Sequence, residues 1–192
     1  MGAALRTRVT QLLGIDHPIL GGGLMWLSDA RYVAALVNAG CMGFITPRSY
    51  ACEADFRVAL ALCAELTHGK PFGVNLTLSH RPEANAMVPR WMDAALAHGV
   101  KIFETAGHAP AELIKALHKA NAVVIHKASS IRHGLAADRA GLVLAAHHVA
   151  RHAFRCEGLE RAQHLELLVA DGVGVVGGRR LHRVHGQQLQ RM

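Results

Sequence analysis

The chain has 192 residues, of which 51% are hydrophobic and 5% aromatic, and this composition excludes a disordered protein. The formal net charge of +7 favours anionic partners: nucleic acid, a phosphate-bearing cofactor or an acidic surface. No run of Lys and Arg exceeds two residues, and neither zinc-finger spacing nor an RNA-binding motif is present, so we expect no nucleic-acid partner.

The cysteines and the N-terminus indicate where the protein resides. None of the four cysteines forms a C-x-x-C pair; they are Cys41, Cys52, Cys63 and Cys156. Residues 1–10 contain two Arg and no apolar core of a signal peptide, and no stretch is long and apolar enough for a membrane span. We therefore expect a cytoplasmic protein with free thiols and no membrane partner.

Short apolar runs alternate with longer amphipathic runs along the first 140 residues. The predicted strands are 17–20, 42–46, 72–77, 100–105 and 122–126, and the predicted helices are 30–39, 52–66, 91–98, 110–120 and 131–140. Ser28 and Asp29 are suitable N-caps for the first helix, and Gly40 is a suitable stop. Pro110 fits the first turn of a later helix.

This alternation predicts an α/β fold built from repeated β/α units. Buried strands that recur every 20 to 30 residues or so indicate a parallel sheet with helices outside. An open doubly wound sheet and a TIM-type (β/α)₈ barrel both fit this pattern. Five units are too few for a closed barrel of about 250 residues, so a barrel would be incomplete.

The composition changes after Gly141. Residues 142–192 contain no Ser, Thr, Pro, Asn, Lys, Ile, Tyr or Trp. We therefore divide the chain into a β/α part, residues 1–141, and an atypical Arg-, His- and Gly-rich tail, residues 142–192. Our hypothesis is that a reading-frame shift in a GC-rich gene produced this tail. Resequencing that found one intact frame beyond Gly141 would contradict it.

Glycine and polar residues stand where the predicted strands end. Gly21–Gly23 follow the first strand, Asn75 lies within the third, and Glu104–Gly107 and Lys127 end the fourth and fifth. Active sites of parallel-sheet enzymes lie at this end of the strands. A glycine loop there lets a flat ring approach the backbone, and a lysine can hold the edge of a flavin ring on which negative charge grows. The alternatives are a tight turn and a solvated surface charge.

Several motifs of the sequence resemble nitronate monooxygenases, formerly called 2-nitropropane dioxygenases. The motifs are His17-Pro18-Ile19, Gly22-Gly23, Trp26, Asn38-Ala39-Gly40, Gly43-Phe44-Ile45-Thr46, the run from Pro71 to Leu78, Glu104-Thr105-Ala106-Gly107, Ile125-His126-Lys127 and Arg132-His133. The resemblance covers residues 10–141. It implies an FMN-binding (β/α)₈ barrel in which Gly23, Leu24 and Met25 pack along the isoalloxazine while Asn75 and Lys127 hydrogen-bond the flavin.

The implied reaction is oxidation of an alkyl nitronate by O₂ to a carbonyl compound and nitrite. An NAD(P)H-dependent quinone or enoyl reductase on the same scaffold is the first alternative. An inactive, truncated half-barrel that can pair with a second copy is the other. No catalytic residue is assigned, because the family's Gly-His-x-Gly segment and phosphate-binding loops have no counterpart after Gly141. Cys41 and Ala128 also depart from the family pattern, which often has Gly and Cys there.

Two motifs in the tail suggest ligands but are better explained by chance. The G-x-G-x-x-G run 172–177 lacks the following helix, second strand and acidic residue of a dinucleotide site. His148, His152 and Cys156 have helical spacing, yet they lie in a segment rich in histidine. We therefore predict no metal site.

Overall fold

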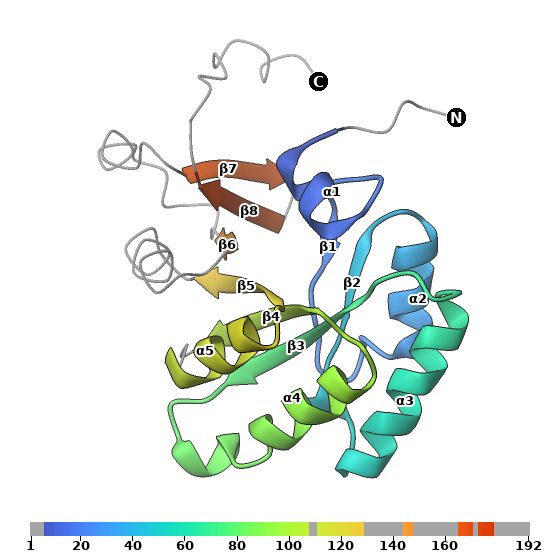
Figure 1. Ribbon diagram of the computed structural model, residues 1–192, viewed down its shortest axis with the longest axis vertical. Coiled ribbons are helices and arrows are strands. Elements are labelled where there is room, and N and C mark those ends of the chain that lie inside the picture. Colours follow the sequence, from blue (N-terminus) through green and yellow to red (C-terminus); the bar gives the residue numbers. More distant parts are fainter. Residues whose placement is uncertain (1–5, 108–110, 129–143, 148–164, 171–172, 179–192) are drawn as a thin grey trace.

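A computed structural model describes residues 6–107, 111–128, 144–147, 165–170 and 173–178 of the chain. These residues form an eight-stranded sheet with the strand order β1-β2-β3-β4-β5-β6-β8-β7. Figure 1 shows the sheet curling, with helices on the outside of the curve. The fold is therefore an incomplete (β/α) barrel, as the sequence predicts.

The first six strands are parallel and follow chain order. They are β1 (Leu20–Gly21), β2 (Met42–Ile45), β3 (Gly73–Leu78), β4 (Ile102–Gly107), β5 (Val123–Ala128) and β6 (Leu144–His147). The connecting helices are α2 (Ala30–Asn38), α3 (Glu53–Leu66), α4 (Val88–Ala97) and α5 (Ala111–Lys119). The five predicted strands are confirmed, although β1 begins at Leu20 rather than at residue 17, and β6 adds a sixth parallel strand beyond residue 141.

An antiparallel pair completes the sheet. β7 (Leu165–Ala170) pairs with β8 (Val173–Gly178), and β8 runs antiparallel to β6. Most of the G-x-G-x-x-G run thus lies in a strand, whereas a dinucleotide site needs it in a loop that opens a helix. The predicted helix 131–140 and the trio His148, His152 and Cys156 lie outside the described residues, and the proposed boundary at 141 stays a prediction.

Local capping explains where the helices begin and end. The Asp29 side chain accepts a hydrogen bond of 2.8 Å from the Tyr32 amide, so α2 begins where the sequence predicts. Gly40 follows with a φ of 81°, which glycine adopts without strain. α4 begins at Val88, earlier than the predicted residue 91, because Pro89 fits the first turn of a helix. In the described segments, no helix has the length and hydropathy of a membrane span.

A short helix that the sequence did not predict packs against the inner face of the sheet. α1 (Arg8–Leu13) is only six residues long, too short for a clear periodic pattern. A capping box between Thr7 and Thr10 stabilises its first turn. Its buried residues pack with inward-facing strand residues in one cluster: Val9, Leu13, Leu20, Met42, Phe44, Ile102 and Ile125.

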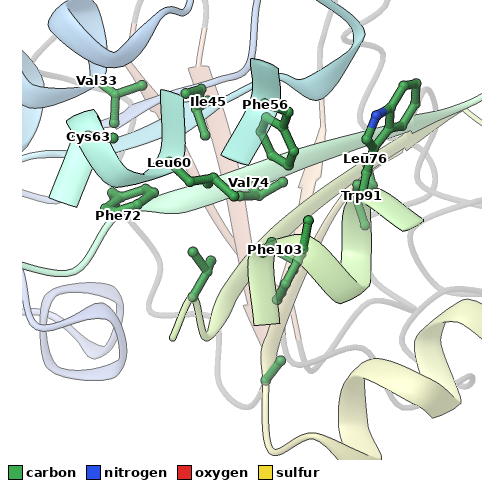
Figure 2. Packing of buried hydrophobic residues seen from close by; sticks show 14 of the residues in the cluster. Val33, Ile45, Phe56, Leu60, Cys63, Phe72, Val74, Leu76, Trp91 and Phe103 are labelled. Atoms are coloured by element: carbon green, nitrogen blue, oxygen red, sulfur yellow. The ribbon is translucent and has the colours of Figure 1, made fainter. Parts of the chain in front are cut away.

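Strands β2 to β5 have buried residues on both faces, so successive residues pack into different cores. On β4, Ile102 belongs to the inner cluster and Phe103 packs against the helices. The outer core also contains Leu60 of α3 and Val74 of β3, drawn in Figure 2. This alternation directs every second strand residue into the interior of the curve, where polar residues replace apolar ones toward the strand ends.

Leu60→Ala should lower the free energy of unfolding by about 2–5 kcal/mol, because it removes a fully buried side chain and leaves a cavity. Leu62→Ala, on the same helix at a position 38% exposed, is the matched control and should cost less than about 1 kcal/mol. Urea unfolding followed by circular dichroism measures both. Equal costs would contradict the placement of the outer core.

The described thiols should differ in reactivity. Burial, followed by the charge of Asp29, raises the pKa of the Cys63 thiol to about 12, and burial also raises the pKa of Cys41. Cys52 is exposed at the N-cap of α3. Because the thiolate is the nucleophile, iodoacetamide at pH 8 should label Cys52 and spare the two buried thiols, as peptide mass spectrometry can show. Labelling of native Cys63 at the rate of Cys52 would contradict this.

A raised pKa also sets the direction of a pH effect. The folded state holds the Cys63 proton more tightly than the unfolded state, whose thiol has the ordinary pKa of 9.0. The stabilisation that this thiol contributes is complete below pH 9 and is lost as the pH rises toward 12.

Candidate functional site

The loop between β1 and α2 forms one wall of the site. Its turn is fixed by Ser28, a fully buried residue whose hydroxyl accepts a hydrogen bond of 2.8 Å from the Leu24 amide. The same hydroxyl donates to the Gly22 carbonyl at 3.3 Å. Ser49 accepts from the Trp26 amide at 2.8 Å, which ties the loop to the segment after β2. The loop is therefore held by side chains rather than by strand pairing.

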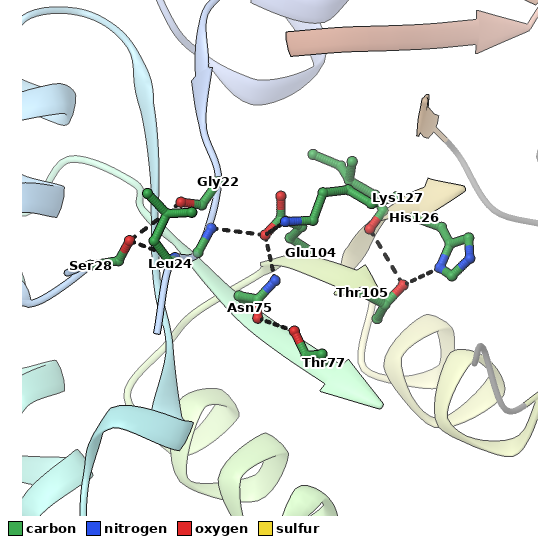
Figure 3. Close-up of polar contacts among 11 residues, drawn as sticks. Gly22, Leu24, Ser28, Asn75, Thr77, Glu104, Thr105, His126 and Lys127 are labelled. Carbon is green, nitrogen blue, oxygen red and sulfur yellow. Dashed lines mark hydrogen bonds and ion pairs between the residues drawn. The ribbon is translucent and has the colours of Figure 1, made fainter. Parts of the chain in front are cut away.

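One carboxylate oxygen gathers donors from three strands or their loops. Glu104 Oε2 accepts from the Gly23 amide at 3.0 Å and from the Asn75 side-chain amide, and it forms an ion pair with Lys127 Nζ at 3.2 Å. Figure 3 shows Glu104 at the centre of these contacts. Thr77 donates to Asn75 Oδ1 at 2.8 Å, which fixes the orientation of the amide.

Strand register explains why these side chains meet. Asn75 on β3 lies directly opposite Glu104 on β4, so both point into the interior of the curve. Lys127 is two residues beyond Ile125, the β5 partner of Glu104, and therefore faces the same side. Its long side chain reaches back to the carboxylate. Gly23, Asn75 and Lys127, three residues predicted from the sequence as cofactor contacts, thus lie around one point.

The two glycines of the loop allow this close approach. A Cβ atom on Gly23 would lie 2.3 Å from Asn75 Cβ, a distance at which atoms overlap. A Cβ atom on Gly22 would lie 2.9 Å from Glu104 Oε1 and 3.3 Å from Lys127 Nζ. Only glycine at these positions lets the loop backbone contact the polar group without displacing it.

Apolar side chains continue from the glycines along the loop. Leu24, Met25, Trp26 and Leu27 are all exposed, Trp26 to 74%. Trp26 also has a φ of 69°, uncommon for a bulky residue. These exposed apolar side chains directly follow Gly23, whose amide bonds the Glu104 carboxylate. The predicted contacts Leu24 and Met25 belong to this exposed apolar segment.

Other residues of the predicted motifs face away from this site. His126 is buried on the opposite face of β5, where its Nδ1 lies 3.0 Å from the Thr105 hydroxyl. Arg132 and His133 lie outside the described residues. In the described segments, no group of three His, Cys, Asp or Glu residues is placed to hold a metal ion.

Glu104 is the residue whose importance the sequence did not reveal. The sequence placed it at the mouth of the fourth strand but gave it no role. A signal was present, because an acidic residue within an apolar strand must be paired when buried. The sequence could not indicate which donors it would meet, since these lie 81, 29 and 23 residues away in the chain.

The chain is similar to a known protein family over most of its length. The family model described as nitronate monooxygenase matches residues 6–178. The chain belongs to the nitronate monooxygenase family. This match includes the segment that carries Gly23, Asn75, Glu104 and Lys127, and it extends beyond residue 141, where the resemblance drawn from motifs ended. The origin of the tail remains a hypothesis.

Two curated relatives are similar to about two thirds of the chain. Both are named (3aS,4S,5R,7aS)-5-hydroxy-7a-methyl-1-oxo-octahydro-1H-indene-4-carboxyl-CoA dehydrogenase. The protein from Mycobacterium tuberculosis is 33% identical over 67% of this chain, and that from Rhodococcus jostii is 31% identical over 68%. The matched residues make up 34% and 35% of the relatives, so the chain spans about a third of their length.

Two solved structures share the fold. FabK from Thermotoga maritima is 31% identical with a TM-score of 0.64, over 72% of this chain and 42% of that one. Nitroalkane oxidase from Streptomyces ansochromogenes is 20% identical with a TM-score of 0.55, over 71% and 47% of the two chains. The second likeness concerns the fold alone. Together they show that the curled sheet is part of a TIM-type barrel.

Ser28→Ala should lower the free energy of unfolding by about 1–3 kcal/mol, because it removes a fully buried hydroxyl that bonds the part-buried Leu24 amide and Gly22 carbonyl. Ser49→Ala is the matched control in the same loop. It should cost less than about 1 kcal/mol, since water can replace its bond to the exposed Trp26 amide. Urea unfolding measures both, and a larger cost for Ser49→Ala would contradict the account of the loop.

Proposed function

We propose that the β/α part of the chain, which carries Gly23, Asn75 and Lys127, binds FMN and that the protein is a flavin-dependent oxidoreductase. The arrangement of Gly23, Asn75 and Lys127 around one point is the observation that carries the proposal. Membership of the nitronate monooxygenase family supports it, and so does the net positive charge, which favours a phosphate-bearing ligand.

The residues present fit a flavin ring. Gly22 and Gly23 leave the backbone open where a Cβ would fill the space, and the apolar side chains of Leu24 and Met25 continue the same surface. Lysine has three N–H donors, and the Lys127 side chain is 32% exposed beside its ion pair. In the proposal, Lys127 and Asn75 hold the polar pyrimidine edge and the glycine loop covers one face.

We propose oxidation of an alkyl nitronate by O₂ to a carbonyl compound and nitrite as the reaction. The flavin, when bound, supplies the electron transfer. The loop residues 23–25 position the ring, and Lys127 directs a positive charge toward an anion near its edge. We assign no proton transfer, because no described residue is placed as the base.

A second candidate is reduction or dehydrogenation of a different substrate on the same scaffold. The curated relatives at 31–33% identity carry the name of a dehydrogenase of a CoA thioester, whereas the nitroalkane oxidase is only 20% identical. This favours an enoyl or quinone reductase that uses NAD(P)H as the alternative. Both candidates need the same flavin contacts.

The remaining proposals concern partners and compartment. The free thiols Cys41, Cys52 and Cys63 support a cytoplasmic location. In the described part of the chain the curled sheet ends at β1 and β7, and such strand edges support self-association. The third functional alternative is a half-barrel that binds no flavin. Flavin binding and the size-exclusion mass distinguish this alternative from the two enzymes.

The purified chain should bind FMN, and Lys127→Met should weaken binding about 10- to 100-fold, because it removes a charged hydrogen-bond donor. Lys119→Met, on the exposed face of α5, is the matched control with the same loss of charge and should leave binding unchanged. Quenching of FMN fluorescence measures the dissociation constants. An unmodified chain that binds no FMN would contradict the proposed function.

Turnover then separates the two enzymatic candidates. Nitrite release from a nitronate under air, without NADH, is the expected result for the leading candidate. Bleaching of the bound flavin by NADH, with no nitrite from nitronates, would instead support the reductase.

A further inference from the structure

Glu104 contacts each polar residue that we assign to the flavin, although no part of the proposed function requires an acid there. Its Oε2 accepts hydrogen bonds from the Gly23 amide and the Asn75 side-chain amide, and it forms an ion pair with the Lys127 ammonium. The carboxylate thus lies on the same side of the sheet as the side chains that we assign to the ring edge. An acidic residue so close to an edge that gains negative charge needs an electrostatic explanation.

The ion pair changes the charge that a ligand experiences. The Glu104 side chain is 5% exposed and that of Lys127 is 32% exposed, so the pair is poorly solvated on the glutamate side. Coulomb interactions are strong in such surroundings. The negative charge of Glu104 therefore offsets much of the positive potential that Lys127 alone would create at the ring edge.

The pair also fixes the direction of the ammonium. Lysine has four rotatable side-chain bonds, and an unpaired ammonium at a strand end would sample many positions. The carboxylate is held by the Gly23 and Asn75 amides, so it gives Lys127 a rigid anchor. Orientation and charge compensation thus come from the same oxygen.

We propose that Glu104 is a positioning residue that fixes Lys127 against the flavin edge and, by offsetting its charge, lowers the affinity for reduced relative to oxidised flavin. This rests on the proposed function, because it requires a flavin in the site. Reduction adds negative charge to the pyrimidine edge, so a net positive potential favours the reduced form and a compensated potential favours it less. Glu104 and Lys127 therefore act in opposite directions on the same equilibrium.

The test measures the dissociation constants of oxidised and reduced FMN for the whole chain, the latter under anaerobic conditions. Glu104→Gln keeps an acceptor oxygen for the Gly23 amide but removes the charge. The ratio of the oxidised to the reduced dissociation constant should rise on the order of tenfold. Lys127→Gln should lower this ratio. The double variant should lie between the two single variants.

Glu112→Gln is the matched control, because it removes an equal charge whose ion pair with Lys115 is 84% and 72% exposed. Solvent screens that pair, so the ratio should not change. If Glu104→Gln does not fold, Glu104→Asp and Lys127→Gln replace it in the test. Glu104→Asp should keep the ratio of dissociation constants within about threefold of that of the unmodified chain, because the charge remains. Lys127→Gln should still lower this ratio.

The outcomes separate this inference from the proposed function. An unmodified chain that binds no FMN overturns the proposed function and this inference with it. FMN binding with a ratio that falls, or stays constant, in Glu104→Gln overturns the inference alone. If Glu104 had a purely structural role, Glu104→Gln would weaken the binding of oxidised and reduced FMN equally. Such a result would also overturn the inference.

Discussion

The buried carboxylate of Glu104 is the interaction on which the site depends. A charge that is almost fully buried must be paired, and here the partners come from the β1–α2 loop, from β3 and from β5. Removing the acid would leave Lys127 without its anchor and the Gly23 amide without its acceptor. One oxygen atom therefore both anchors the glycine loop at Gly23 and fixes the direction of the lysine.

The fold creates the conditions for this interaction. Parallel strands flanked by helices bury both faces, and alternate residues point outward to Leu60 and its neighbours or inward to the curve. Apolar residues such as Phe44 and Ile125 fill part of the interior with α1. Asn75 and Glu104 take adjacent inner positions on β3 and β4, so the polar group lies next to the buried apolar cluster of the interior.

The Gly23 and Asn75 amides and the Lys127 ammonium meet at one carboxylate oxygen, and exposed apolar side chains follow Gly23 along the loop. This combination is the observation behind the proposed flavin site. Family membership agrees with this chemistry. The chain spans about a third of the length of the curated relatives that it matches.

The sequence by itself determined the β/α order and most of the helix ends, and it singled out three of the four residues that meet at the Glu104 carboxylate. Strand periodicity, the Asp29 cap and Gly40 are local signals, readable because their effects act over a few residues. The tertiary structure alone decided the role of Glu104, the packing of α1 and the parallel pairing of β6. Each of these depends on strand register and on contacts between residues far apart in the chain, which no local pattern specifies.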